Sequence, residues 1–113
     1  MTGNKYFDEL PRIDRDIICA VIDDALAAGH VISVNDGEEW TVRKSADRAE
    51  VIAALVTTDA DTLSIRDAEG VRVASVYLVY GNEPGVVICD HTDTPAANAL
   101  LARANALAEA YSD

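Results

Sequence analysis

The sequence predicts an α+β fold in which helices pack mainly on one face of an antiparallel five-stranded sheet. The first observation is length, because 113 residues suffice for one domain with one core and are too few for two. The second is hydrophobic spacing, which switches between helical and strand-like periods in the order α-ββ-α-βββ-α. The third is that short, turn-rich connections join the strand-like segments, which favours antiparallel hairpins. Residues 1–113 are therefore expected to form a single domain, with a hairpin and a three-stranded meander.

Residues 11–28 predict the first helix, because apolar side chains recur there every three or four positions and Gly29 supplies a stop. The apolar arc of the helical wheel runs from Ile13 to Leu26. The remaining positions are expected to face solvent: Arg12, Asp16, Ala20, Asp23 and Ala27. Asp16 and Asp23 stand two turns apart on that face, roughly 10 Å from each other at the rise of an α-helix.

Residues 31–34 and 39–42 predict a hairpin that turns at residues 35–37, since Asn, Asp and Gly tolerate the backbone of a tight turn. Alternation places four apolar side chains on one side of this hairpin: Ile32, Val34, Trp40 and Val42. Trp40 is accordingly expected in the core. Three acids at the tip are expected in solvent: Asp36, Glu38 and Glu39.

Two further helices are predicted. Residues 45–56 form the first of them, with Ser45 or Asp47 as its N-cap. The other begins with Thr94 as N-cap and Pro95 at the first helical position, and continues as an Ala-rich segment. Its inward stripe is expected to consist of Leu100, Leu101, Ala104, Leu107, Ala108 and Tyr111.

Three strands are predicted between these helices, over residues 62–66, 71–80 and 85–89. Tyr77 and Tyr80 fall on opposite faces of the long strand, so at most one of them is expected in the core. An exposed tyrosine suits a protein interface because it buries a large area at a low cost in conformational entropy.

Charge is the most unusual property of the composition. Nine Lys and Arg stand against twenty Asp and Glu, which gives a net charge of −11. Residues 1–39 and 73–113 are acidic, whereas residues 40–72 are nearly balanced. Such a field repels free nucleic acid and anionic membranes and favours basic protein surfaces. Direct binding to nucleic acid or to a membrane is therefore not expected.

The longest apolar runs, residues 17–22 and 76–80, fall far short of the roughly 18 residues that cross a bilayer. Residues 1–16 lack the apolar central region of a secretory signal, so cytoplasmic residence is expected. Cys19 and Cys89 lie in apolar runs without a CxxC motif. Two buried, reduced thiols are therefore expected, rather than a disulfide or a zinc site.

Residues 59–62, Asp-Ala-Asp-Thr, share the DxD letters of the DxDxT motif of haloacid-dehalogenase-type phosphotransferases, but the preceding residues look helical and no suitably placed lysine follows. A calcium loop starting there would need Gly and Glu where Ser64 and Gly70 stand. A polar connection between helix and strand is expected instead. No P-loop, GxGxxG or GxSxG motif occurs, so no cofactor is predicted and the chain is predicted not to be an enzyme.

Cys89, Asp90 and His91 stand together and suggest a nucleophile or a metal site. A Cys–His pair needs the imidazole beside the sulfur, and the alternation of strand residues between two faces argues against it. A metal would need further ligands, for which only the distant His30 or nearby carboxylates are available. A loop with a solvated histidine is the expectation, and a small enzyme using this region is one alternative.

Three segments carry a resemblance to known proteins: "ISVNDGEEWTVRKSADRAEVIAAL" at residues 32–55, "DTLSIRDAEG" at 61–70 and "LVYGNEPG" at 78–85. Together they resemble small acidic proteins encoded in prophages and other mobile elements of Proteobacteria. The resemblance implies a setting in which such proteins disarm host defence, as anti-CRISPR and anti-restriction proteins do.

The leading hypothesis from the sequence is a non-enzymatic acidic protein of a phage or mobile element. It would bind and inhibit a basic, nucleic-acid-handling host defence protein by offering carboxylates in place of DNA phosphates. The candidate partner-binding residues are Asp16, Asp23, Asp24, Asp36, Glu38 and Glu39. A second alternative is an immunity or antitoxin-like protein that neutralises a basic toxin, and a homodimer is compatible with either.

Overall fold

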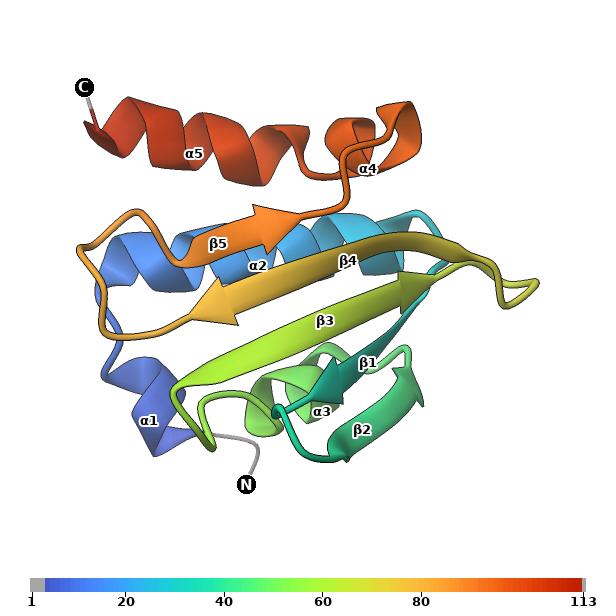
Figure 1. Cartoon of the computed structure of the whole chain (residues 1–113), viewed down its shortest axis with the longest axis horizontal. Helices are drawn as coiled ribbons and strands as arrows, with labels where there is room; N and C mark the ends of the chain where they lie inside the picture. The colour runs from blue at the N-terminus through green and yellow to red at the C-terminus, as the bar shows by residue number, and fades with distance from the viewer. Residues whose placement is uncertain (1–3, 113) are drawn as a thin grey trace.

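The protein has the α+β architecture that the sequence predicts (Figure 1). The computed structural model describes residues 4–112. The strands are β1 (Val31–Asn35), β2 (Trp40–Ser45), β3 (Ala60–Arg66), β4 (Arg72–Val79) and β5 (Ile88–His91). The helices are α1 (Lys5–Asp8), α2 (Arg12–Ala27), α3 (Arg48–Ala53), α4 (Pro95–Leu100) and α5 (Ala102–Ser112). Two details differ from the expected order: the one-turn helix α1 precedes the first expected helix, and the last helix is divided into α4 and α5.

Helices α3 and α4 begin at capping residues that the sequence predicts. The Asp47 carboxylate accepts the backbone N–H groups of Ala49 and Glu50, so Asp47 rather than Ser45 is the N-cap of α3. Thr94 accepts the Ala97 N–H at the start of α4, which has proline in its first turn.

The sheet has the order β2-β1-β3-β4-β5, and every neighbouring pair is antiparallel. In the two central pairings Ser33 lies opposite Ser64, and Ser64 lies opposite Ser75. These three serines therefore form a row across the sheet on one face. The last strand begins at residue 88 rather than at the expected residue 85, because residues 80–87 form a loop with positive φ at Gly81 and Gly85.

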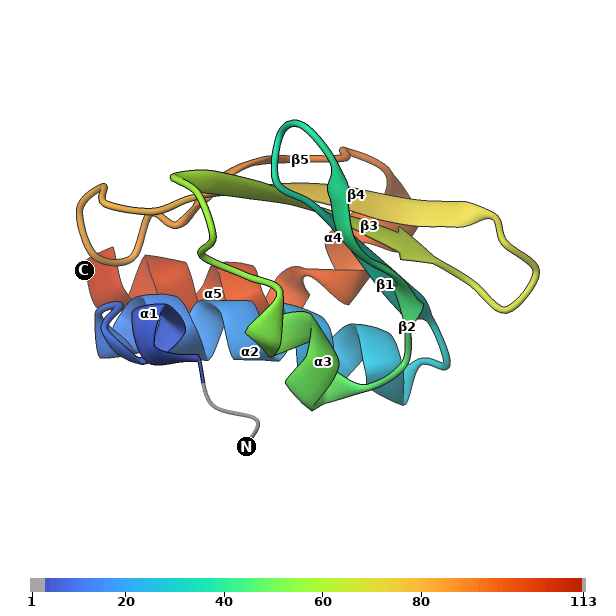
Figure 2. The ribbon, with the colours of Figure 1, turned by 90° about the horizontal axis from the view of Figure 1, so that it is seen from below.

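The helices lie together on one side of the sheet (Figure 2). Leu63 and Ile65 of β3 are fully buried toward this helical layer. The alternate residues of β3, among them Ser64 and Arg66, point to the other face, which no helix covers and which we call the open face. Helix α2 packs against the sheet on one side and against α5 on another. Among residues 4–112, no helix has the length and apolar character needed to span a membrane.

The packing of α5 against α2 shows that one prediction about α2 is wrong. Ala20 was expected to face solvent, but it is fully buried. Asp24, one turn further along the same helix, is ion-paired with Arg103 of α5. The face that carries Ala20 and Asp24 is therefore turned toward α5, which a wheel drawn for one isolated helix does not reveal.

The expectation that Trp40 lies in the core is wrong, since 37% of the residue is exposed. The hairpin register is irregular: Val34 lies opposite Val42, yet the next residue, Asn35, lies opposite Trp40. These shifts break the simple alternation along β2, and Trp40 falls beside Asn35 at the edge of the open face. Ile32 and Val34 are buried as expected, and Val42 packs against the core.

The last helix also departs from its expected inward stripe at one position. Leu101 and Ala104 are buried, but Tyr111 is 53% exposed. Its ring lies over Gly85, where an added Cβ would stand 2.8 Å from the ring. Two tyrosines behave as predicted, with Tyr77 exposed and Tyr80 packed against the core.

The prediction of two buried thiols is wrong for Cys89, which is exposed, and holds only in part for Cys19, which is half-buried. Cys89 lies in the edge strand β5, where only β4 is a neighbour. Burial raises the pKa of the Cys19 thiol.

A buried carboxylate joins the start of α2 to the loop before β5. Asp14 is 3% exposed, and its Oδ1 accepts the backbone N–H of Gly85 at 2.8 Å. The two residues are 71 positions apart in the chain, so this hydrogen bond fixes the loop against the helical layer.

We expect Asp14→Ala to lower the free energy of unfolding by about 1–3 kcal/mol, because the Gly85 N–H would remain buried without an acceptor. Asp16→Ala is the matched control: it removes an exposed acid from the same turn of α2 and should change stability by no more than about 0.5 kcal/mol. Denaturant unfolding of both variants measures the difference. Equal losses would show that the buried hydrogen bond contributes nothing specific.

Candidate functional site

The three acids predicted on α2 are all engaged within the protein. Asp24 accepts a two-pronged contact from the Arg103 guanidinium, with a shortest distance of 2.9 Å. Asp23 accepts from Arg48 Nε at 2.7 Å, and Asp16 lies 3.8 Å from Arg12 Nε. The Arg103 and Arg48 pairs tie α5 and α3 to α2, and the Arg12–Asp16 pair lies within α2. Much of the negative charge on α2 is therefore balanced by arginines of the same chain.

The other three predicted acids lie at the β1–β2 tip, which side-chain hydrogen bonds hold in a defined turn. Asn35 Oδ1 accepts the Gly37 N–H at 2.8 Å. Asp36 Oδ1 accepts the N–H groups of Glu38 and Glu39, each at 2.9 Å. These backbone donors lower the pKa of the Asp36 carboxyl, which keeps it ionised. The tip therefore presents Glu38 and Glu39 outward on a fixed backbone.

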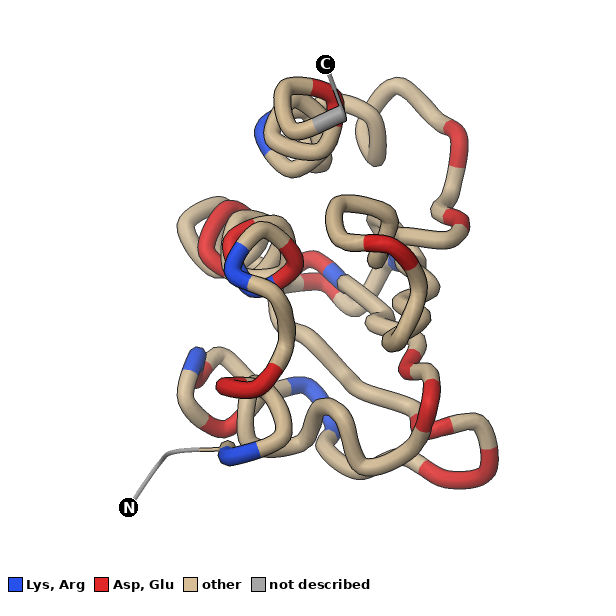
Figure 3. Tube along the Cα trace, turned by 90° about the vertical axis from the view of Figure 1, so that its left-hand side faces the viewer, with Lys and Arg blue, Asp and Glu red and all other residues tan. Residues whose placement is uncertain are grey.

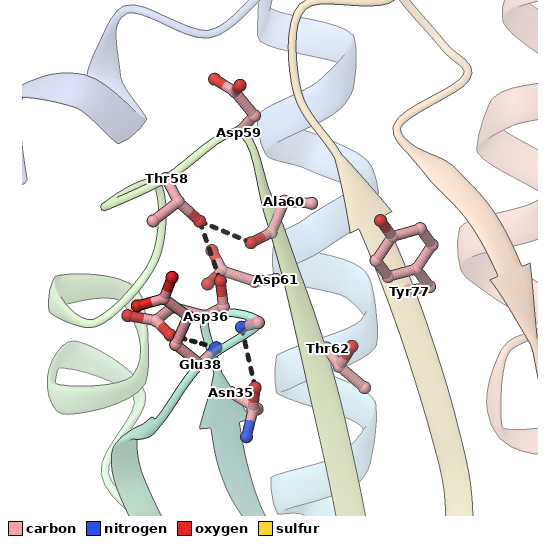
Figure 4. A pocket seen from close by; sticks show the side chains of 10 residues that line it. Asn35, Asp36, Glu38, Thr58, Asp59, Ala60, Asp61, Thr62 and Tyr77 are labelled. Carbon is pink, nitrogen blue, oxygen red and sulfur yellow. Dashed lines mark hydrogen bonds between the residues drawn. The ribbon is translucent and has the colours of Figure 1, made fainter.

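The start of β3 is held beside this tip and completes a hollow of about 460 Å³, which we call the tip hollow. Thr58 Oγ1 donates to the Asp36 carbonyl at 3.1 Å and links the two segments. The tip hollow is lined mainly by Asn35, Asp36, Glu38, Thr58, Asp59, Asp61, Thr62 and Tyr77. In the view of Figure 4, the Asp36, Glu38 and Asp61 side chains lie together to the left of the β3 ribbon, and Thr62 and Tyr77 lie to its right. No Lys or Arg lines it.

Asp61 is the residue at this site that the sequence reasoning missed, because residues 59–62 were expected to form a polar connection. Instead β3 begins at Ala60, and Asp61 is 1% exposed on the helical side of the strand. Its Oδ2 accepts from the Tyr80 hydroxyl at 2.6 Å and from the Val56 N–H at 2.9 Å. Its Oδ1 has no hydrogen-bond partner among the described residues.

The Asp61 carboxylate supports an unusual backbone conformation and has a shifted pKa. Val56 has φ 59, which β-branched residues rarely adopt, and the Asp61 carboxylate accepts its N–H and holds it in place. Burial raises the pKa of Asp61, against the opposing effect of the Tyr80 and Val56 hydrogen bonds. Burial also raises the pKa of Tyr80, so its hydroxyl stays protonated and donates to Asp61.

The six predicted acids do not form one surface. Helix α2 lies in the helical layer, whereas the β1–β2 tip projects on the opposite side of the sheet (Figure 2). Figure 3 views the molecule from one end and shows the acidic tip, red at the lower right, standing clear of the helices. Of the predicted residues, only Asp36, Glu38 and Glu39 gather at one place, and Asp59 and Asp61 join them there.

In the Cys89–His91 region, His91 Nδ1 lies 2.8 Å from the Thr92 carbonyl, and no hydrogen bond within residues 4–112 joins it to Cys89. The alternation argument used against this pair was wrong, since residues 89 and 91 are two apart and share a face in a regular strand. A register shift between Tyr77 and Leu78, opposite this segment, breaks the regular spacing. Within residues 4–112, no three His, Cys, Asp or Glu side chains are placed to hold a metal ion.

Comparisons with protein-family models, with curated proteins and with solved structures found no match to this chain.

The raised pKa of Asp61 predicts a specific pH dependence of stability. The folded protein binds this proton more tightly than the unfolded chain, in which the carboxyl has its ordinary pKa near 3.8. The stability linked to the proton is therefore fully present below pH 3.8 and is lost as the pH rises through the raised pKa. The free energy of unfolding of the wild type minus that of Asp61→Asn should decrease over this window, as measured by denaturant unfolding.

Asp59→Asn is the control for this measurement, because it removes an exposed carboxylate two residues away. If the two variants differ from the wild type by the same amount at every pH, loss of charge rather than burial of Asp61 would account for the result.

Proposed function

We propose that this protein is a non-enzymatic interaction protein that uses its acidic tip to bind a basic surface on a nucleic-acid-handling protein. The observation that carries the proposal is the contrast between its two groups of acids. Asp16, Asp23 and Asp24 of α2 are paired with arginines. Asp36, Glu38 and Asp59, by contrast, line a hollow without any Lys or Arg. Unbalanced negative charge therefore faces solvent at the tip.

The tip hollow suits a lysine or arginine side chain of a partner. Its carboxylates offer acceptors for charge-assisted hydrogen bonds. Tyr77, 42% exposed, adds an aromatic face for a guanidinium or ammonium group. Glu39 stands exposed beside the hollow and extends the negative surface. A basic groove that normally binds nucleic-acid phosphates has the complementary charge, so its occupation by the tip would exclude the nucleic acid.

The resemblance to small acidic proteins of prophages favours a host defence component as this partner, with inhibition as the result. An immunity-type protein that neutralises a basic toxin would use the same chemistry, and the identity of the captured partner separates the two.

Affinity capture from lysate of a host strain with its native defence systems tests the proposal. A nucleic-acid-binding defence protein should be retained in low-salt washes and released by high salt, because exposed ion pairs are screened. Recovery of a basic toxin would favour the immunity reading. Recovery of no basic protein would contradict the proposal.

A matched pair of variants then locates the binding surface. Glu38→Gln, Glu39→Gln and Asp59→Asn together should weaken binding to the captured partner about tenfold, as expected for three exposed ion pairs of roughly 0.5 kcal/mol each. Asp36 is left intact because it shapes the turn. The control combines Asp16→Asn, Asp23→Asn and Asp24→Asn, which removes the same number of charges from α2.

Dissociation constants for the two triple variants give the decisive comparison. The α2 variant should bind with nearly wild-type affinity. Equal weakening by both would show that net charge, rather than the tip, governs binding, and a larger effect on α2 would place the interface there.

A further inference from the structure

A second hollow, of about 280 Å³, lies on the open face of the sheet and carries the opposite charge. It is lined by Ser33, Trp40, Arg43, Lys44, Ser64 and Arg66, together with Gly70, and we call it the basic hollow. Ser33 and Ser64 lie opposite each other in the β1–β3 pairing, two residues along the strands from the Asn35–Thr62 pair that borders the tip hollow. No Asp or Glu lines it, although the chain has a net charge of −11.

Within residues 4–112, the three cations of the basic hollow form no ion pair with a carboxylate. The ion pairs among the described residues use other arginines, and none involves Arg43, Lys44 or Arg66. Arg66 Nη1 donates to the Gly70 carbonyl at 2.8 Å, which positions its guanidinium and leaves its other N–H groups to donate elsewhere. The Arg43 guanidinium lies 5.7 Å from the centre of the Trp40 ring. Positive charge is therefore concentrated here, and no ion pair among the described residues offsets it.

A buried hydroxyl without a partner marks the floor of this hollow. Ser64 is 4% exposed, and its Oγ makes no hydrogen bond within residues 4–112. Ser33 Oγ accepts the Lys44 N–H at 2.8 Å, so its own proton is available to a further acceptor. Buried hydroxyls are almost always hydrogen-bonded, because an unpaired one costs free energy. A ligand oxygen that reaches the floor of the hollow would supply the missing acceptor.

We propose that the basic hollow binds a small phosphate-bearing ligand with a planar ring, of the mononucleotide class. Two arginines, a lysine and two serine hydroxyls form a donor set suited to phosphate oxygens. Trp40, the only tryptophan of the chain, supplies a partly exposed ring on which a base can stack. A long polynucleotide is disfavoured, because its further phosphates would meet the negative field of the rest of the protein.

Trp40 fluorescence gives a direct readout, since every tryptophan signal comes from this site. Titration with adenosine monophosphate should produce a saturable change in emission, and adenosine without phosphate should produce none over the same range. Inorganic phosphate should bind more weakly than the nucleotide, because it lacks the stacking ring.

Three variants assign the effect to the hollow. Arg66→Gln should weaken nucleotide binding about tenfold, the size expected for one charge-assisted hydrogen bond. Arg72→Gln is the matched control: it lies opposite Arg66 in the sheet register, is exposed and does not line the hollow, so binding should change less than about twofold. Ser64→Ala should weaken binding while leaving the free energy of unfolding unchanged or higher, since it removes an unpaired buried hydroxyl.

The proposal would be overturned by the absence of any saturable change with adenosine monophosphate, or by equal losses in Arg66→Gln and Arg72→Gln. Equal affinities for inorganic phosphate and for the nucleotide would overturn the nucleotide class. Much tighter binding of a short oligodeoxythymidine than of the mononucleotide would overturn the small-ligand assignment. None of these outcomes bears on the acidic tip, because the two hollows share no lining residue.

Discussion

The rest of the structure depends on one constraint, which is that helices cover only one face of the antiparallel sheet (Figure 2). Each central strand must therefore present an apolar face to the helices and a face compatible with water to the outside. In β3, Leu63 and Ile65 enter the core, while Ser64 and Arg66 point the other way. The open face is not covered by a helix and can be lined by residues that bind other molecules.

Charge is distributed over this framework in a way that the net value of −11 conceals. The carboxylates of α2 join neighbouring helices through Arg48 and Arg103 and so belong to the structure of the helical layer. The carboxylates at the β1–β2 tip have no such partners among the residues that line the tip hollow. Farther along the same strands, the basic hollow reverses the sign. The open face is therefore acidic at one end and basic at the other, and each end suits a different class of ligand.

Much of the fold could be predicted because the signals are local. Helix α2, the tight turn at residues 35–37 and the start of α4 at Thr94 follow from spacing, turn residues and capping. The errors arose where strand register or distant segments decide the environment. Trp40 lies at the open face because of register shifts between β1 and β2, and Ala20 is buried because α5 packs against α2. Asp61 had a weak signal, since Asp61, Leu63 and Ile65 alternate, but Asp is disfavoured in strands, so local propensity does not predict that β3 includes it.

The sequence by itself determined the fold class, the order of the elements, the acidic balance and the turn that exposes Glu38 and Glu39. Only the tertiary structure decided which acids are paired internally, which are left at the tip, and that Arg43 and Arg66 meet beside Trp40 and Ser64. The physical reason is range. Periodicity and capping act over a few neighbouring residues, whereas an ion pair such as Asp24–Arg103 joins positions 79 apart and exists only after the helices have packed.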